Sequence, residues 1–227
     1  MAFTKRLRIL VSRIRKESLS GKLVEALSEI PDVDIHGLPD DWDITDPATF
    51  PSNLGEFDMV YNCSGITLNE AVYQHNFVNA QRVFNVNVVG AMNLTTEYAK
   101  QRNTNQLGGC IVHVGSTGSR KVFTNCSAYC ASKAALAHYV QCAGYELRKS
   151  GIAVIGVHPG NINGTQMTKN VQLDLQVNRG MSPEQVDKIY SEAHDPYDVA
   201  SFMVSLIGMP LLEITGENFY LGQGWKG

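Results

Sequence analysis

The sequence predicts an α/β protein built on one doubly wound parallel sheet. Short apolar runs that suit strands alternate with longer segments that suit helices, which is the pattern of consecutive βαβ units. The strand-like runs are almost continuously apolar, as expected of a sheet that helices cover on both faces. At 227 residues the chain fits one large domain, since domains average ~150 residues, and we expect residues 1–227 to form a single domain.

The strands and helices are predicted in a regular order along the chain. Runs rich in Val, Ile and Leu predict strands over Leu7–Val11, 33–36, Met59–Asn62, 110–114, 152–157 and Asn218–Leu221. Apolar residues at helical spacing predict helices over 19–30, 77–101, 128–149 and 196–209. Ser150-Gly151 is a typical stop after the third of these helices. Residues 161–181 are rich in Asn and Gln and predict a polar loop that closes as a lid.

Composition argues against several classes of protein. The net charge is −3 and the pI is about 6.1, whereas a dedicated nucleic-acid binder carries a basic excess. No apolar run approaches the ~18 residues of a membrane-spanning helix. Ile9-Leu10-Val11 is too short for a signal-peptide core, so we expect a cytoplasmic protein. The five cysteines lack the paired spacing of a zinc site or disulfide framework, and we interpret them as small buried hydrophobic side chains, with no metal bound.

Small or polar residues follow three of the predicted strands. These turns are Asn62-Cys63-Ser64-Gly65, Gly115-Ser116 and His158-Pro159-Gly160. Ligands of open α/β sheets bind beyond the carboxyl ends of the strands. We therefore expect the three turns to gather at one edge of the sheet and to form the functional site.

Tyr129 and Lys133 are the residues at this edge with the clearest chemistry. Their i, i+4 spacing places them on one helix face, one turn apart. A nearby ammonium group lowers the pKa of a phenol, so the pair can act as a general acid/base, although the same spacing suits a plain helix surface. The hydroxyl of Ser116 could bond a substrate carbonyl oxygen. Asn87, within an apolar helical stretch, could bend the helix and hold a water.

Several segments, in this order and spacing, resemble those of the short-chain dehydrogenase/reductase family. They are Asn62-Cys63-Ser64-Gly65, Val86-Asn87-Val88-Val89-Gly90, Ile111-Val112-His113-Val114-Gly115-Ser116, Tyr129-Cys130-Ala131-Ser132-Lys133, Val157-His158-Pro159-Gly160 and Ile214-Thr215-Gly216-Glu217-Asn218. The resemblance covers almost the whole chain. It implies a Rossmann-like sheet and an NADP- or NAD-dependent oxidoreductase that interconverts a small-molecule carbonyl and an alcohol.

The resemblance also implies roles for single residues. Asn87, Ser116, Tyr129 and Lys133 would form the catalytic tetrad, in which Tyr129 exchanges the proton and Lys133 lowers its pKa and holds the nicotinamide ribose. Asn87 would support a proton relay through water. The cofactor would also contact residues on the three turns and the segment after the fifth strand, namely Asn62, Ser64, Gly65, Pro159, Gly160, Ile162 and Thr165.

Asp43-Ile44-Thr45-Asp46 resembles a further segment of the family. The resemblance implies that Asp43 binds the adenine amino group and that the backbone of Ile44 contacts the ring. Asp46-Pro47 suits a helix N-cap followed by Pro equally well. Because few residues separate His36, at the end of the second predicted strand, from Asp43, we expect the region after this strand to be shortened by a whole helix.

The loop after the first strand departs from the family pattern. Aligning Val11-Ser12 with the family's Val-Thr places Arg13, Glu17 and Leu19 where the family has its three phosphate-binding glycines. In one interpretation, Arg13, Arg15 and Lys16 replace the glycine backbone with side-chain contacts to phosphate. Lys16 and the lack of an acidic residue after Ile35-His36 then favour NADP over NAD. In a second interpretation, the loop has lost cofactor binding. In a third, the basic residues only form a solvated surface segment.

Three functions of different classes therefore remain open. The first is an oxidoreductase that uses the tetrad, and the second is a non-catalytic or repurposed binding protein that keeps the fold. A third, minor class is a structural subunit of an oligomer, whose helices matter more than its site. In every case the helices over 77–101 and 128–149 carry more apolar surface than one sheet face can cover. Members of the resembled family pair these helices, so we expect a homodimer or homotetramer.

Overall fold

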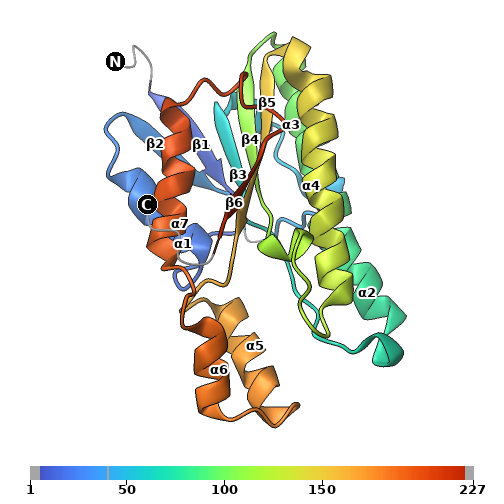
Figure 1. The fold of residues 1–227 in the computed structure, drawn as a ribbon. Helices are drawn as coiled ribbons and strands as arrows, with labels where there is room; N and C mark the ends of the chain where they lie inside the picture. The colour runs from blue at the N-terminus through green and yellow to red at the C-terminus, as the bar shows by residue number, and fades with distance from the viewer. Residues whose placement is uncertain (1–5, 40, 223–227) are drawn as a thin grey trace.

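The computed structural model describes residues 6–39 and 41–222 and contains a six-stranded, all-parallel sheet (Figure 1). The strand order is β2-β1-β3-β4-β5-β6. The strands are β1 (Leu7–Val11), β2 (Val33–Gly37), β3 (Met59–Asn62), β4 (Gly109–Val114), β5 (Ile152–Pro159) and β6 (Asn218–Leu221). The order reverses between β1 and β3, and an open α/β sheet binds its ligand at such a switch point. The Rossmann-like doubly wound sheet is therefore confirmed.

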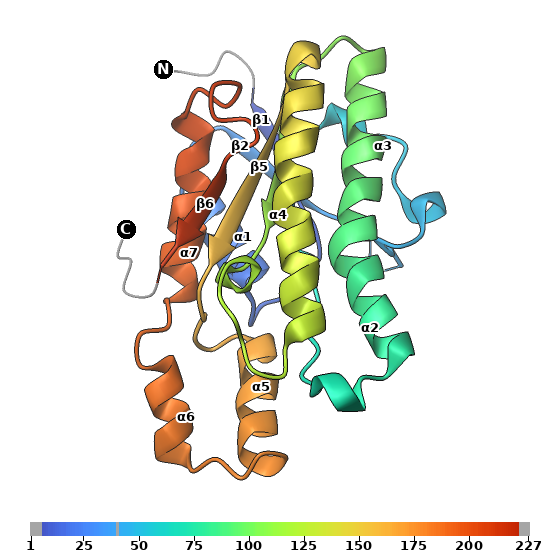
Figure 2. The ribbon, with the colours of Figure 1, turned by 45° about the vertical axis from the view of Figure 1, so that its right-hand side comes forward.

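Helices cover both faces of the sheet, as Figures 1 and 2 show. On one face, α1 (Leu19–Ser28) packs with α7 (Pro196–Ser205), and Ile9 and Val11 point into this layer. On the other face, α3 (Gly90–Thr104) and α4 (Ser127–Leu147) pack against Leu10 and its neighbours. Alternate residues of the same strand therefore enter opposite cores, which explains why the strands read as continuous apolar runs.

Two expectations about the helices need correction. The predicted helix over 77–101 consists of α2 (Phe77–Phe84), a π-helical turn over Asn85–Val89, and α3. The predicted lid loop contains α5 (Gln166–Val177) and α6 (Pro183–Tyr190), which lie side by side beyond the carboxyl ends of the strands (Figures 1 and 2). The side-chain hydroxyls of Thr165 and Ser182 cap the N-termini of α5 and α6. The many polar residues of these helices obscured the spacing of their apolar residues in the sequence.

Two other expectations were tested by the fold. Between β2 and β3, the helical elements of the described residues are two 3-10 turns, Pro47–Thr49 and Leu54–Glu56, so the region is shortened as expected. The interpretation of the cysteines as buried side chains is confirmed for Cys110 and wrong for the exposed Cys142, whereas Cys63, Cys126 and Cys130 are only partly buried. Across the described residues, no helix is both long and apolar enough to cross a bilayer.

Candidate active site

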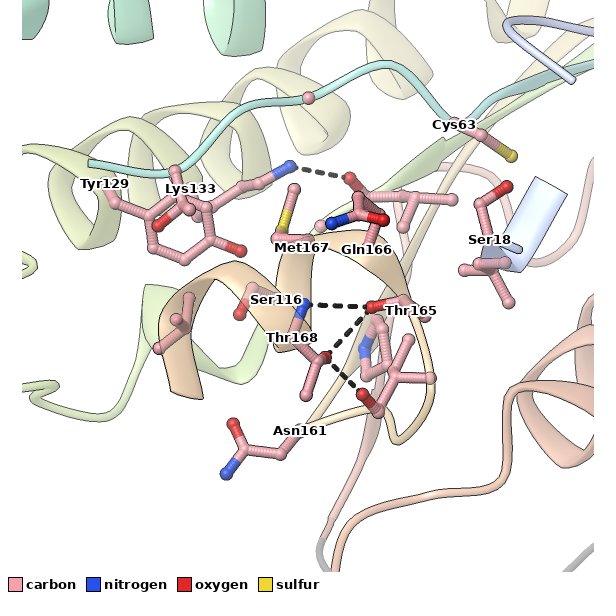
Figure 3. Close-up of a pocket in the computed structure, with 18 of the residues that line it drawn as sticks. Ser18, Cys63, Ser116, Tyr129, Lys133, Asn161, Thr165, Gln166, Met167 and Thr168 are labelled. Atoms are coloured by element: carbon pink, nitrogen blue, oxygen red, sulfur yellow. Dashed lines mark hydrogen bonds between the residues drawn. The ribbon is translucent and has the colours of Figure 1, made fainter. Parts of the chain in front are cut away.

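A cavity of about 650 Å³ opens at the carboxyl ends of the strands. Its walls come from the N-terminal end of α1, the turns after β3 and β4, the start of α4, the end of β5, and helices α5 and α6. The three turns predicted to gather at this edge each contribute lining residues: Cys63, Ser64 and Gly65; Gly115 and Ser116; Pro159 and Gly160. Figure 3 shows Ser18 on one side of this cavity and Tyr129 with Ser116 on the other.

Ser116 and Tyr129 present their hydroxyl groups to the same part of the cavity (Figure 3). The Oγ of Ser116 accepts a hydrogen bond of 3.0 Å from the backbone nitrogen of Gly118. Its own proton can still be donated to another oxygen, that of Tyr129 or of a bound molecule. Burial raises the pKa of Tyr129 to about 12, while the hydrogen bond with the Ser116 side chain acts to lower it.

Lys133 lies one turn after Tyr129 on α4, as predicted. Its Nζ donates a hydrogen bond of 2.9 Å to the carbonyl oxygen of Val114 and lies 5.9 Å from the centroid of the Tyr129 ring. Burial lowers the pKa of Lys133 to about 8. The ammonium group therefore lies between the end of β4 and the ring of Tyr129.

Asn87 lies in the π-helical turn, where it joins the turn after β3 to α4. Its Oδ1 accepts from the nitrogen of Ile66 at 2.9 Å, and its Nδ2 donates to the oxygen of Ile66 at 2.9 Å and to Ser132 Oγ at 3.0 Å. Ser132 Oγ in turn donates to the carbonyl oxygen of Tyr129. Asn87 is 1% exposed and is absent from the cavity wall, so its side chain holds the position of the catalytic candidate on α4.

The loop after β1 keeps a glycine-like backbone without glycine. Arg13 has a φ of 55°, in the left-handed region that normally favours glycine. The hydroxyl of Ser20 donates to the oxygen of Arg13 at 2.8 Å, and that of Ser18 donates to the oxygen of Arg15. A Cβ at Gly21 would lie 2.3 Å from the oxygen of Arg15, so Gly21 allows the loop to fold tightly onto α1. Gly21 is therefore the residue whose lack of a side chain lets this loop pack closely against α1.

The charged side chains of this loop differ in position. Arg13, Arg15 and Glu17 line the cavity, whereas Lys16 is exposed and lines neither this cavity nor the next, contrary to its predicted role. Glu17 forms an ion pair of 2.7 Å with Lys169 of α5, and this pairing holds the pKa of Glu17 below its usual range. The ion pair offsets the repulsion that a free carboxylate would exert on a phosphate.

Asp43 and Ile44 line a second cavity of about 710 Å³. Arg13 lines both cavities and therefore stands at their junction. Asp43 Oδ1 accepts from the nitrogen and the hydroxyl of Thr45, both at 2.8 Å, and these bonds lower the pKa of Asp43. Arg82 also lines the second cavity, but no spacing in the sequence pointed to it.

The remaining predicted cofactor contacts divide into two groups. Ile162 and Thr165 line the first cavity, although the hydroxyl of Thr165 also caps α5 by accepting from the nitrogen of Thr168 at 3.2 Å. Asn62 does not line it: the residue is 3% exposed, and its Oδ1 and Nδ2 are bonded to the nitrogen of Ser64 and to Nδ1 of His113. Asn62 therefore stabilises the turn after β3 from the side that faces away from the cavity.

Residues that the sequence did not single out complete the first cavity. They come from loops and from the unpredicted helices, and include Thr67, Asn69, Phe123, Cys126, Met167, Val171 and Tyr190. His158 belongs to the segment Val157-His158-Pro159-Gly160, but no role was assigned to it from the sequence alone. It does not line the cavity and instead contacts the backbone of a residue that does. Its Nδ1 is 3.2 Å from the nitrogen of Ser116.

Comparisons with known proteins point to one family. The profile of a family described as short chain dehydrogenase matches residues 24–176. A short-chain dehydrogenase, srdE, from Neurospora crassa is 33% identical over 116 residues, which are 51% of this chain and 39% of the relative. An L-xylulose reductase from Caenorhabditis elegans is 29% identical over 144 residues, 63% of this chain and 57% of the relative. The matches thus span about half the length of these curated relatives.

The fold has solved counterparts as well. A variant of actinorhodin polyketide ketoreductase, solved with NADPH, superposes with a TM-score of 0.85 at 18% sequence identity, covering 99% of this chain and 98% of the other. This likeness supports the fold of the chain.

Proposed function

The chain belongs to the short-chain dehydrogenase family, and from this premise we propose that it is an oxidoreductase that interconverts a carbonyl and an alcohol with NADP(H). The observation that supports the proposal most strongly is that Ser116, Tyr129 and Lys133, from β4 and α4, line one cavity at the sheet's switch point. We further propose that residues 1–227 act as one domain, in the cytoplasm, on a small-molecule substrate.

The residues present fit a dinucleotide, although not through the usual glycine loop. The first cavity reaches from the N-cap of α1 to Tyr129, and the second contains Asp43 and Ile44. Arg13 at their junction would neutralise a phosphate, and the N-terminus of α1 favours negative charge. We propose that Arg13 and Arg15 hold the phosphates, with Ser64, Gly65, Pro159, Gly160, Ile162 and Thr165 lining the remainder of the site.

The proposed chemistry needs little movement of the protein. The cofactor supplies or accepts the hydride when it is bound. Ser116 donates its proton to the substrate oxygen and holds it beside the phenol. Tyr129 gives its proton to the forming alkoxide, which is a far stronger base than a phenolate, so a pKa raised by burial suits a proton donor. Lys133 keeps two ammonium protons beyond its bond to Val114 for a ribose hydroxyl.

The test is a screen of aldehydes and ketones with NADPH and NADH, using wild type and Tyr129→Phe. We expect turnover with NADPH that Tyr129→Phe abolishes, because Tyr129 is the phenol of the cavity wall that shares a hydrogen bond with Ser116. Binding of NADPH should persist in the variant. Near-full activity of Tyr129→Phe would contradict the proposed role of the phenol.

A second candidate function is supported by the altered loop. Glu17 and its ion pair with Lys169 place lid and loop in direct contact, where a dinucleotide's phosphates would pass. A repurposed binding protein of the same fold would show this feature without needing turnover. A titration that detects neither NADPH nor NADH binding would favour this second candidate.

A further inference from the structure

Part of the lining of the first cavity is not explained by the proposed cofactor. These residues, called the substrate end below, are Thr67, Asn69, Phe123, Cys126, Val171 and Tyr190. Three of them, Asn69, Cys126 and Tyr190, lie close together. The Sγ of Cys126 donates to Asn69 Oδ1 at 2.8 Å. Burial, together with the adjacent Cys126 thiol, raises the pKa of Tyr190.

The substrate end carries no charged side chain among the residues that the structure describes. The charged residues of the whole cavity wall are Arg13, Arg15 and Glu17, on the loop before α1, and Lys133. Lys133 is bonded to Val114 and faces the β4 backbone. A charged group on a substrate would therefore have no partner of opposite charge among the residues that line the substrate end.

Two charged groups close in sequence to this wall, Arg179 and Glu70, already have partners. Arg179, between α5 and α6, forms an ion pair of 3.0 Å with Asp174 and also donates to the oxygen of Thr124. Glu70, next to Asn69, accepts from the nitrogen of Asn76 at 2.8 Å and from the side chain of Asn79 at 2.9 Å. Recruiting either group for a substrate would break these contacts.

The rest of the wall combines apolar surface with free polar groups. Phe123, Val171 and the ring of Tyr190 provide apolar area, and burial of apolar area favours binding. Within the described part of the chain, the amide nitrogen of Asn69 and the hydroxyl of Tyr190 make no hydrogen bond. Each can bond an oxygen or amide on a bound molecule.

We propose that the substrate end selects an uncharged carbonyl compound with an aromatic body that carries a further hydrogen-bonding group. This inference rests on the proposed oxidoreductase function, because it assumes that the reacting carbonyl lies at Ser116 and Tyr129. The physical reason is the cost of burying an unpaired charge, which a neutral group of the same shape avoids. Carboxylated and phosphorylated carbonyl compounds are disfavoured for the same reason.

The test uses a pair of ketones of nearly equal shape, para-acetylbenzamide and para-acetylbenzoate, which differ in charge near neutral pH. Their Kd values are measured by ligand-observed NMR on the full chain with NADP⁺, which cannot reduce a ketone. Their kcat/KM values are measured separately with NADPH. We expect the benzoate to bind at least about tenfold more weakly than the benzamide, which is about 1.4 kcal/mol.

Charge-adding variants with matched controls show where the preference arises. Phe123→Lys should bring the two Kd values together or reverse them, whereas Phe123→Leu, which removes the ring but adds no charge, should keep the preference for the benzamide. Val171→Lys and Val171→Ala repeat the comparison on α5, should the Phe123 variants not fold. Equal binding of the two ketones by wild type would overturn the inference, as would a preference that neither lysine variant changes.

The two proposals fail in different ways. Preferential binding of the benzamide without any turnover by NADPH would support the substrate end and contradict the oxidoreductase function. Efficient reduction of the benzoate would support the function and overturn the inference. Binding of neither ketone up to its solubility limit would also overturn the inference.

Discussion

The Nδ1 atom of His158, at the end of β5, lies 3.2 Å from the backbone nitrogen of Ser116, which follows β4. Its Nε2 lies 2.7 Å from Asn218 Oδ1, and Asn218 Nδ2 donates to the oxygen of Ala137 in α4. A Cβ at Gly115 would lie 2.2 Å from the imidazole, so only glycine allows this approach. These contacts connect the candidate serine with the helix that carries the candidate tyrosine.

His158→Leu should therefore disturb Ser116 without touching the cavity wall. The buried nitrogen of Ser116 would lose its acceptor, at a cost of about 1–3 kcal/mol in the free energy of unfolding. We expect kcat to fall with little change in KM. The change would displace Ser116, which contacts the substrate oxygen, and would leave the residues of the substrate end in place. Urea unfolding and steady-state kinetics measure both. His138→Gln, an exposed histidine on α4, should change neither quantity.

Ser116→Ala should reduce kcat by about 10²–10³-fold, as loss of one donor to a developing oxyanion does. The matched control is Ser119→Ala, since Ser119 donates to the oxygen of Ser116 at 2.7 Å but is not part of the cavity wall. Equal losses in the two variants would indicate a structural effect on the turn instead of a contact with the substrate.

Acid should destabilise the protein through two buried histidines. Burial lowers the pKa of His158 to about 4 and that of His113 to about 3, both from an ordinary 6.5. Below the ordinary value the unfolded chain binds protons that the folded chain does not, so stability falls as the pH drops through this window. Each histidine contributes up to about 1.4 kcal/mol per pH unit.

Urea unfolding between about pH 7 and pH 4.5 measures this slope before most carboxylates titrate. His113→Gln should reduce the slope, and His138→Gln should leave it unchanged. A stability that is constant over this range would show that the imidazoles are not held neutral in the folded state.

Arg13→Ala and Arg15→Ala should each weaken NADP(H) binding. A charge-assisted contact contributes roughly 1.5–3 kcal/mol, which corresponds to about 10–150-fold in Kd. Lys16→Ala is the control, because Lys16 is exposed and lines neither cavity. Calorimetry at two salt concentrations should also show weaker binding at higher salt and a preference for NADP(H) over NAD(H). Tight binding that changes neither with salt nor in the arginine variants would contradict the proposal that Arg13 and Arg15 hold the phosphates.

The protein should assemble through α2 and α4. Phe77 and Val78 of α2 are 89% and 72% exposed, and Tyr145 of α4 is 83% exposed, so residues 6–39 and 41–222 leave most of their apolar surface uncovered. Light scattering at micromolar concentration should give the mass of a dimer or tetramer, and Phe77→Glu should reduce it. Val122→Glu, on the loop before α4, is the exposed control. A wild-type monomer would disprove this prediction.

The sequence by itself predicted the strands and the residues that meet at the candidate site. Short runs of apolar and aromatic residues predicted β1, β3 and β6 with the observed bounds, because such residues favour strands. Tyr129 and Lys133 were predictable because an i, i+4 spacing fixes their common helix face. Ser116 was predictable because it follows a buried strand, at the edge where α/β sheets bind ligands.

Only the tertiary structure decided what surrounds these groups. The hydrogen bond from Lys133 to Val114 and the raised pKa of Tyr129 depend on how the two side chains are buried. The spacing of residues in the sequence does not show this burial. The pairing of Glu17 with Lys169 joins residues 152 positions apart. His158 and the substrate end likewise depend on contacts between separate elements. Local periodicity specifies which face of an element is buried, whereas the distances between elements follow from how all of them pack together.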